Sequence, residues 1–407
     1  MKVFALGGYG KVGLPAVKLL AQSDLVTEIA IAGRNLKLAE EAIKEIGKKA
    51  IAVHTDGTDE QKLTSLLPSY DIIMNTAIDD TVLPAIQAAI QARVHYCDVN
   101  VYKIAEALKL DSKAKSANIT TIIACGISPC ISNIMGVYLA RKLDQVEQLR
   151  LGRADIYNFQ TGEEITPLQW PKEFQESQID LNNFRSYINW VFSVIQENGF
   201  RTVRSCKDGQ WGETDPARDE LDVPLTNGGT IPFYSYYCGD LLVPSLPEDL
   251  SKVPPVEMLF SLFPPQLHDL LRGYSLRILE GNIDYESATD LFYKTVDSDP
   301  HHWLTLKSTL PPIPKLWVEA VGLKEDRAAR CRCWFTAPMW NVGGYFLTSV
   351  SLATAVNMIL RDEIQKRGVT IAEKAYKPEP FLEEVASLIP DSLPNQKMLD
   401  ESFEWLK

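Results

Sequence analysis

Three glycines near the start of the chain have the spacing of a phosphate-binding loop. Gly8, Gly10 and Gly13 form the pattern G-x-G-x-x-G directly after the apolar run "KVFAL". Between a strand and a helix, Gly8 permits a tight turn, Gly10 lets the backbone approach a pyrophosphate, and Gly13 lets helix and strand pack closely. The free N–H groups of the helix then face the phosphate charge. The alternative is a glycine turn without a ligand. The predicted cofactor-binding residues of this loop are Gly8, Tyr9, Gly10, Lys11, Val12 and Gly13.

The end of the second predicted strand, "IAIAGRN", indicates which dinucleotide the loop binds. Sites that prefer NAD usually carry Asp or Glu here, to bind the ribose 2′-hydroxyl. Gly33, Arg34 and Asn35 stand here instead, so no carboxylate repels a 2′-phosphate. Arg34 can pair with that phosphate, and Asn35 can donate another hydrogen bond. We therefore predict NADP as the cofactor. The alternative for Arg34 is an exposed charge at a helix start.

Two further loops are expected near the cofactor, because open parallel sheets bind ligands beyond the carboxyl ends of their strands. Asp56 in "VHTDGTD" follows the third predicted strand, and it either accepts the adenine amino group or caps the next helix. Asn75, Thr76 and Ala77 follow the fourth strand. The sequence therefore extends the predicted cofactor site to these residues.

The candidates for catalysis lie at the ends of the fifth and sixth predicted strands, where a nicotinamide is expected. They are Tyr96 and Asp98, in "VHYCDVN" at 94–100, and Cys125. Asp98 can stabilise an iminium cation or position a substrate amine, or it can cap the following helix. Cys125 can donate a proton, or it can be a small buried side chain that serves packing alone.

Later parts of the chain offer fewer candidates. Arg153, Arg201 and Arg204 can clamp substrate carboxylates, although arginines are mostly surface charges. His301 and His302 are adjacent, so they cannot easily share one face, and no carboxylate motif accompanies them. No metal site is therefore predicted.

The elements that must position these residues follow from the pattern of the first third of the chain. Apolar runs such as "DIIMN" and "TTIIA" show little polar alternation, as in strands buried on both faces of a parallel sheet. The repeated β-α order implies a doubly wound, Rossmann-type sheet. The predicted strands are 2–7, 28–33, 50–54, 71–75, 94–97 and 119–125, and the predicted helices are 12–23, 37–48, 60–67, 81–92 and 103–117.

The pattern changes near residue 150, where tryptophans, prolines and polar turns become frequent. "GFRTVRSCKDGQW", "LDVPLTNGGTIPFYSYY" and "RCRCWFTAP" are typical of antiparallel strands, and "NGG" at 227–229 predicts a hairpin. Helices are predicted near 180–197, 255–272, 284–297 and 343–366. The expected fold is α/β, with an NADP-binding Rossmann domain at 1–140, an α+β substrate and dimerisation domain at 141–340, and a helix and tail at 341–407 that return to the first domain.

Composition excludes several classes of protein. The 407 residues are 45% hydrophobic and 23% charged, as in soluble globular proteins of two or three domains. A net charge of −12 argues against a nucleic-acid partner. The apolar stretch at 345–360 is broken by polar residues and is too short to cross a membrane. An odd number of scattered cysteines and the lack of a signal-peptide pattern predict reduced thiols and a cytoplasmic protein.

Four of these segments together resemble the saccharopine dehydrogenase-like family of NADP-dependent reductases, which includes saccharopine reductase and carboxynorspermidine dehydrogenase. They are "GGYGKVG", "AGRN", "VHYCDVN" and "CGISPCISN" at 125–133. In the last, Cys125, Gly126 and Pro129 match the family form, whereas Cys130 stands where the family has glycine. The resemblance covers 1–140 well and 340–385 weakly, and no motif matches in 150–335.

The resemblance implies the reduction of an imine formed from an amine and a carbonyl compound (a keto acid or an aldehyde), or the reverse oxidation of a secondary amine. It implies an amino-acid-like or polyamine-like substrate, and it favours a homodimer. Two alternatives stay open. One is an NADP-dependent dehydrogenase that acts on a C–O bond. The other is an NADP-binding redox sensor or assembly partner without catalytic activity.

Overall fold

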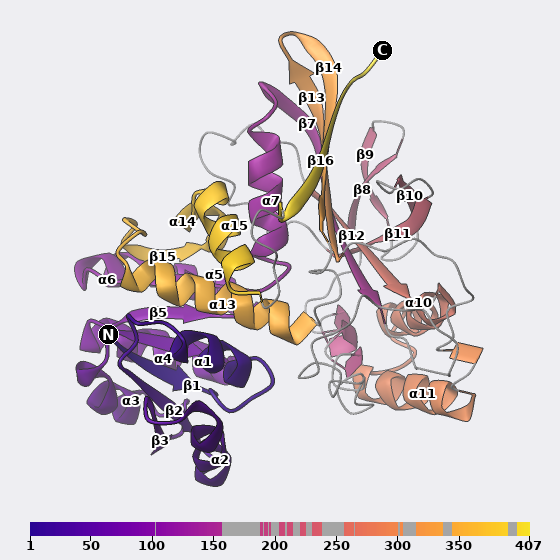
Figure 1. Ribbon diagram of the computed structural model, residues 1–407. Coiled ribbons are helices and arrows are strands. Elements are labelled where there is room, and N and C mark those ends of the chain that lie inside the picture. Colours follow the sequence, from indigo (N-terminus) through magenta and orange to yellow (C-terminus); the bar gives the residue numbers. More distant parts are fainter. Residues whose placement is uncertain are drawn as a thin grey trace. The chain divides into compact units, whose positions relative to one another are not determined.

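The chain divides into two units, each with its own seven-stranded sheet (Figure 1). The first unit contains Met1–Tyr138 and Val342–Met398, and the second contains Leu139–Pro244, Leu250–Asn341 and Leu399–Lys407. The computed structural model describes residues 1–101, 103–156, 188–189, 191–193, 195–196, 203–207, 210–214, 220–224, 230–237, 256–263, 265–299, 302–303, 315–336, 344–389 and 397–407.

The sheet of the first unit is parallel throughout, with the order β15-β6-β5-β4-β1-β2-β3. The chain runs outward from β1 to β3 and then resumes at β4 on the other side of β1, so the strand order reverses between β1 and β4. Such a reversal is where doubly wound sheets bind ligands. The predicted Rossmann fold is confirmed. The strands are β1 (Lys2–Leu6), β2 (Glu28–Gly33), β3 (Ala50–His54), β4 (Ile72–Asn75), β5 (His95–Asp98), β6 (Thr120–Ile123) and β15 (Gly368–Ile371).

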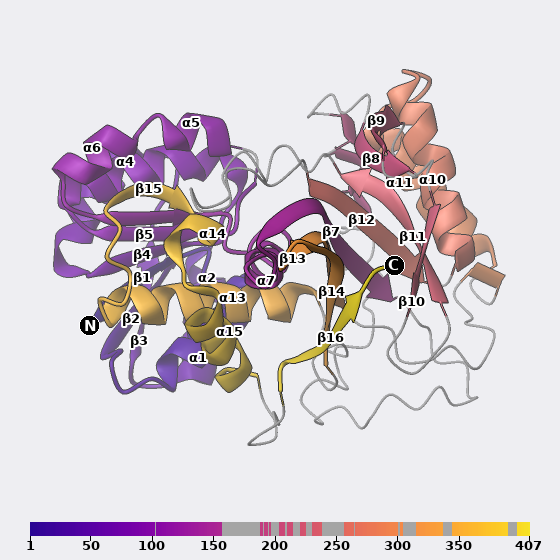
Figure 2. The same cartoon turned by 90° about the horizontal axis from the view of Figure 1, so that it is seen from above.

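Helices cover both faces of this sheet, as its largely apolar and buried strands require. Figure 2 shows α4, α5 and α6 on one side and α1 and α13 on the other. The segment predicted as one helix at 103–117 forms two short helices, α5 and α6. The helices of this unit before residue 131 are α1 (Gly13–Ala21), α2 (Leu36–Ile46), α3 (Glu60–Leu66), η1 (Leu67–Ser69), η2 (Asp79–Thr81), α4 (Val82–Ala92), α5 (Ile104–Leu108) and α6 (Asp111–Ser116).

The chain returns to the first unit after residue 342, and it brings both a helix and a strand. Helix α13 (Gly344–Leu360) is buried along most of its length, and its Ser349 Oγ donates a hydrogen bond to the Val12 carbonyl, 2.7 Å away. The predicted returning helix is confirmed, although it ends before residue 366. Strand β15, which was not predicted, then pairs with β6. The remaining helices are α7 (Ile131–Ala140), in which the first unit ends at Tyr138, and α14 (Ala372–Ala375) and α15 (Pro378–Ser387) of the first unit.

The second unit is built on a mixed sheet with the order β10-β11-β12-β7-β13-β14-β16, in which only β12 and β7 pair in parallel. Helices α10 (Pro265–Leu279) and α11 (Tyr285–Ser298) pack with β12 around Phe260 and Phe292. The strands are β7 (Gln145–Ile156), β8 (Val203–Lys207), β9 (Gln210–Thr214), β10 (Glu220–Pro224), β11 (Thr230–Tyr237), β12 (Val256–Phe263), β13 (Leu316–Lys324), β14 (Arg327–Phe335) and β16 (Leu399–Trp405).

Two predictions for this region were wrong. The segment 255–272 was expected to be helical, but 256–263 forms strand β12, and the helix starts only at Pro265. Periodicity cannot separate a continuous apolar run such as "VEMLFSLF" from a buried helix. The end of the predicted returning tail also differs, because Leu399–Trp405 pairs with β14 in the second sheet. The predicted hairpin is confirmed by the pairing of β10 with β11, while "NGG" itself lies outside the described residues.

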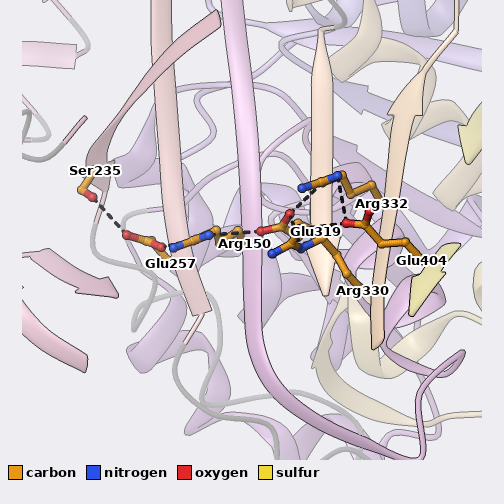
Figure 3. A network of polar contacts seen from close by, with 7 residues as sticks. All are labelled: Arg150, Ser235, Glu257, Glu319, Arg330, Arg332 and Glu404. Carbon is orange, nitrogen blue, oxygen red and sulfur yellow. Dashed lines mark hydrogen bonds and ion pairs between the residues drawn. The ribbon is translucent and has the colours of Figure 1, made fainter. Parts of the chain in front are cut away.

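A row of charged side chains crosses one face of the second sheet (Figure 3). Arg150 on β7 lies 2.7 Å from Glu257 on β12 and 3.1 Å from Glu319 on β13. Glu319 also pairs with Arg332 on β14 at 2.7 Å. Both glutamates are almost fully buried, and each has an arginine partner, as buried charges require. The row holds equal numbers of arginines and glutamates, so its charges balance. This indicates that the row holds neighbouring strands in register and does not bind a ligand. Its members are Arg150, Ser235, Glu257, Glu319, Arg330, Arg332 and Glu404.

Candidate cofactor and active site

The sharp turn of the glycine loop lies one residue earlier than predicted. Gly7, not Gly8, has the positive φ of +75° that favours glycine. A Cβ atom on Gly7 would also lie 2.8 Å from the amide nitrogen of Ala77. The loop after β4 therefore packs directly on the turn. Gly7 lies outside the G-x-G-x-x-G spacing, so the motif did not identify it.

The other glycines of the loop have the contacts that a phosphate cradle needs. A Cβ on Gly13 would overlap the Gly7 carbonyl oxygen, and one on Gly8 would lie 2.8 Å from the Ala5 Cβ. Both positions are therefore filled by the protein itself. A Cβ on Gly10 would meet only the Gly7 oxygen, at 3.2 Å, so that side of the loop is open. A ligand backbone can approach there, as predicted.

The N-terminus of α1 has amide groups to offer a phosphate. No side chain caps this helix, and its first turn carries no acidic residue. Among the described residues, the amides of Lys11 and Val12 donate to no acceptor. The Lys11 ammonium lies 5.7 Å from the centre of the Tyr345 ring on α13, so a cation also stands beside the loop. These residues fit a pyrophosphate.

The end of β2 presents Arg34 and Asn35 as predicted. Both are exposed, and Asn35 caps α2 by accepting a hydrogen bond from the Leu38 amide at 3.1 Å. Asp56, after β3, accepts two hydrogen bonds from Thr58, which are the main cause of the lowered pKa of its carboxyl, with a smaller contribution from Arg34. Asp56 does not cap α3, because Asp59 does. The capping alternative for Asp56 is therefore wrong, and its contact with adenine stays a prediction.

The loop after β4 is fixed by the side chain of Asn75, which is fully buried. Its amide nitrogen donates to the Tyr96 hydroxyl at 3.2 Å, and its oxygen accepts from the Ala77 amide at 3.0 Å. Thr76 donates to the Leu6 carbonyl at 3.2 Å. The loop is thus tied to β1 and β5, the two strands beside β4. Its side chains hold the glycine turn in place, a role that the sequence pattern did not reveal.

Asp98 and Tyr96 form a buried pair at the carboxyl end of β5. The Tyr96 hydroxyl donates to Asp98 at 2.7 Å, and neither side chain is exposed. Asp98 also accepts hydrogen bonds from the amides of Ala124, at 2.9 Å, and Asn100, at 3.2 Å. It does not cap α5, whose N-cap is Lys103, so the capping alternative is wrong. Asp98 instead fastens the loops after β5 and β6 to each other.

Burial controls the ionisation of the predicted catalytic residues. It raises the pKa of the Tyr96 hydroxyl, and the Asp98 charge adds to the effect. It also raises the pKa of the Cys125 thiol, with further contributions from Cys130 and Cys97. Cys125 is therefore a neutral thiol at neutral pH, and nucleophilic thiolate chemistry is not expected of it. The catalytic roles of Tyr96, Asp98 and Cys125 stay predictions.

A second buried carboxylate lies at the same edge of the sheet and was not predicted. Glu373, in α14 just after β15, is 3% exposed and accepts a hydrogen bond from Asn133 at 2.8 Å. Burial raises the pKa of its carboxyl from 4.5 to about 7. A carboxyl that titrates near neutral pH at a ligand-binding edge is a candidate for proton transfer. Its sequence position, far from every motif, gave no signal.

Cys130 is the last residue of the connection from β6 to α7, and its backbone has a conformation that favours glycine. Its φ is +112°, which explains why the family has glycine at this position. Its thiol accepts a hydrogen bond from Ser351 on α13 at 3.2 Å. A further chain of contacts joins Ser128 to Ser132 and Ser132 to Asn133, the partner of Glu373. The "CGISPCISN" segment therefore links the returning chain to the loop after β6.

Several other predicted residues cannot be joined to this site. Arg153 lies on β7, in the second unit. Arg201 and His301 lie outside the described residues, and the side chain of Arg204 does as well. Among the residues that the structure describes, no group of His, Cys, Asp or Glu is arranged to hold a metal ion. Within the same residues, no helix is long and apolar enough to cross a membrane.

Comparison with known proteins agrees with this geometry. Residues 3–122 match the family described as "Saccharopine dehydrogenase NADP binding domain". The match spans the glycine loop, the end of β2 and the Tyr96–Asp98 pair. The first part of this chain is therefore a saccharopine dehydrogenase-type NADP-binding domain, and the predicted cofactor, NADP, is confirmed.

Two individual proteins extend the likeness. The chain is 24% identical to carboxynorspermidine synthase of Vibrio cholerae over 182 residues, which is 38% of this chain and 44% of that protein. The alignment thus spans less than half of the relative. The fold matches apo saccharopine dehydrogenase (L-Glu forming) of Saccharomyces cerevisiae with a TM-score of 0.66, over 99% of both chains and at 15% identity. At that identity the likeness establishes the fold, including the second domain.

Proposed function

We propose that this protein is an NADPH-dependent oxidoreductase that acts on a carbon–nitrogen bond. It reduces an imine formed from an amine and a carbonyl compound, or it catalyses the reverse oxidation of a secondary amine. The substrate is an amino-acid-like or polyamine-like small molecule. The proposal extends to the whole chain an NADP-binding domain of the saccharopine dehydrogenase type.

The observation that carries the proposal is the gathering of buried ionisable groups at the carboxyl edge of the sheet that bears the glycine loop. Asp98 is the last residue of β5, Cys125 follows β6 and Glu373 follows β15, so three neighbouring strands bring them to the carboxyl edge of one sheet. All three are nearly inaccessible to solvent. Buried carboxyls with raised pKa values are concentrated at functional sites, and this favours an enzyme over a protein that only binds NADP.

The residues divide the work as follows. The glycine loop and the α1 amides would hold the pyrophosphate, and Arg34 would hold the 2′-phosphate. When bound, NADPH supplies the hydride for the reduction. Asp98 places a negative charge at the sheet edge, where a cationic imine is stabilised. Glu373 can hold or release a proton near neutral pH, as the addition of an amine to a carbonyl and the loss of water both require.

The test is NADPH oxidation by the purified chain with pairs of carbonyl compounds and amines, each component being omitted in turn. The proposal predicts turnover only when both components are present. Oxidation with a carbonyl compound alone would instead support a dehydrogenase that acts on a C–O bond. Tight NADPH binding without turnover over a broad panel would support a non-catalytic binding protein. Homodimer formation is proposed as well, and light scattering coupled to size-exclusion chromatography tests it independently.

A further inference from the structure

Tyr9 connects the glycine loop to the N-terminus of α2. Its side chain lies over Gly33, the last residue of β2, where an added Cβ would be 2.7 Å from the tyrosine Cε1 atom. Its hydroxyl oxygen accepts a hydrogen bond from the Asn35 amide at 3.3 Å. The phenol ring therefore spans the distance between the pyrophosphate loop and the residues predicted to select NADP.

The Tyr9 hydroxyl stands where sites that prefer NAD place a carboxylate. That carboxylate lies at the end of the second strand, and it accepts a hydrogen bond from the ribose 2′-hydroxyl. A tyrosine hydroxyl is neutral, so it does not repel a 2′-phosphate as a carboxylate would. It can also donate its own proton, for which the described residues provide no acceptor. Tyr9 is only partly buried, so a ligand can reach it.

We infer that Tyr9 is a specificity-determining residue, whose hydroxyl donates a hydrogen bond to the 2′-phosphate of NADP beside the Arg34 guanidinium. Gly33 is then part of the same 2′-phosphate recognition site, because only a residue without a Cβ leaves room for the Tyr9 ring. The Asn35 amide orients the hydroxyl by donating to its oxygen, and this leaves the tyrosine proton for the phosphate. The inference depends on the NADP-binding domain and not on the proposed imine reaction.

The test compares dissociation constants for NADPH and NADH, measured by nicotinamide fluorescence on the full chain. A hydrogen bond to a charged group contributes enough that Tyr9→Phe should weaken NADPH binding by about ten-fold or more. NADH has no 2′-phosphate, so its affinity should change by less than about two-fold. Tyr70→Phe is the matched control, because Tyr70 precedes β4 at the opposite edge of the sheet. It should leave both affinities unchanged.

A second variant removes the contact without altering Tyr9. Gly33→Ala places a methyl group in the space of the ring, so the hydroxyl must move. It should weaken NADPH binding as Tyr9→Phe does. The double variant should bind NADPH about as tightly as whichever single variant binds it less tightly, because both changes remove the same interaction. Thermal melting of each variant confirms that it is folded before binding is measured.

Three results would overturn the inference. Equal losses for NADPH and NADH in Tyr9→Phe would assign the hydroxyl to a part that the two cofactors share. Unchanged NADPH affinity would show that the hydroxyl makes no contact with the ligand. Fully additive effects in the double variant would separate Gly33 from Tyr9. Failure of the imine assay would not affect any of these binding results, so the two proposals fail independently.

Discussion

The Asp98 carboxylate joins three parts of the fold, and this position changes what a substitution there should do. It accepts hydrogen bonds from the Tyr96 hydroxyl and from two amides, one after β5 and one after β6. Each of these donors would be left in a buried place if the carboxylate were lost. The side chain of Asp98 therefore holds the loops after β5 and β6 together, whatever its part in catalysis.

Asp98→Asn should lower both stability and turnover. The new amide would donate to the Tyr96 oxygen, which already accepts from Asn75, so the tyrosine proton would lose its acceptor. A buried donor without an acceptor should lower the free energy of unfolding by about 1–3 kcal/mol. Urea unfolding measures this change. Loss of the charge should also reduce kcat by roughly 30-fold or more, while NADPH affinity is kept.

Asp59→Asn is the matched control. Asp59 caps α3, and asparagine caps a helix about as well as aspartate does, so this change should leave stability and turnover close to those of the unaltered protein. If Asp98→Asn were equally harmless, neither its structural nor its catalytic role would stand.

Glu373 should make the stability of the protein depend on pH. Its pKa is raised from 4.5 to about 7 in the folded state, so the folded chain binds more protons than the unfolded chain between these values. Stability should therefore fall as pH rises from about 4.5 to 7. Glu373→Gln removes this loss and keeps an acceptor for Asn133, so the variant should be more stable above pH 7, by up to about 3 kcal/mol.

Urea unfolding at a series of pH values measures this difference. The groups that face the Glu373 carboxyl are Asn133, Lys374 and the Cys130 thiol, and none of them is altered in the variant. Glu45→Gln removes a half-exposed carboxylate and should show no such trend. Parallel pH profiles for Glu373→Gln and the unaltered chain would show that Glu373 does not titrate in this range.

At the scale of the elements, the first sheet could be predicted because its strands are short apolar runs. A short apolar run carries one clear signal, and β2 and β3 were predicted with their observed bounds, although β3 at the sheet edge is only partly buried. The same kind of run misled the prediction for β12, since a buried strand and a buried helix look alike without periodicity. Only the antiparallel partner β11 and the parallel partner β7 decide that 256–263 is a strand.

Residues of the candidate site were predicted only where they lie close together in the sequence, within one motif. The glycine loop and the end of β2 are such segments, and the structure gives both the expected setting. The Glu373–Asn133 contact joins residues separated by 240 positions, and no sequence pattern in either segment predicts it. The role of Gly7 was not predicted for a different reason, because its positive φ depends on the packing of the loop after β4.

The charged row on the second sheet should be sensitive to loss of its central acid. Glu319 contacts Arg150 and Arg332 and is 3% exposed. Glu319→Ala removes the partner that these arginines share, while Arg150 keeps Glu257 and Arg332 keeps Glu404, so it should destabilise the second unit by about 1–3 kcal/mol. Fluorescence of Trp317 and Trp334 on the neighbouring strands can follow its unfolding by urea.

Lys324→Ala is the control for that experiment. It removes an exposed ion pair with Asp144 on the same sheet, and such pairs add little to stability, so the unfolding midpoint should not move. An unchanged midpoint for Glu319→Ala as well would mean that the row does not hold the strands together.

For the molecule as a whole, each unit draws on distant parts of the chain. The first unit is completed by α13 and β15 from beyond residue 342, and the second by β16 at the end of the chain. The sequence predicted the returning helix from its apolar length, but it could not assign the last strand. An edge strand of alternating charged and aromatic residues can pair in either sheet, and only tertiary packing selects one.

The most direct test of the proposed reaction follows one deuterium atom. NADPH labelled at C4 of the nicotinamide is incubated with the chain, a carbonyl compound and an amine, and the products are examined by mass spectrometry and NMR. We predict a secondary amine that carries deuterium on the carbon bonded to nitrogen, and no labelled product when the amine is omitted. Deuterium on the carbon of an alcohol, formed with or without the amine, would contradict the assignment to carbon–nitrogen chemistry.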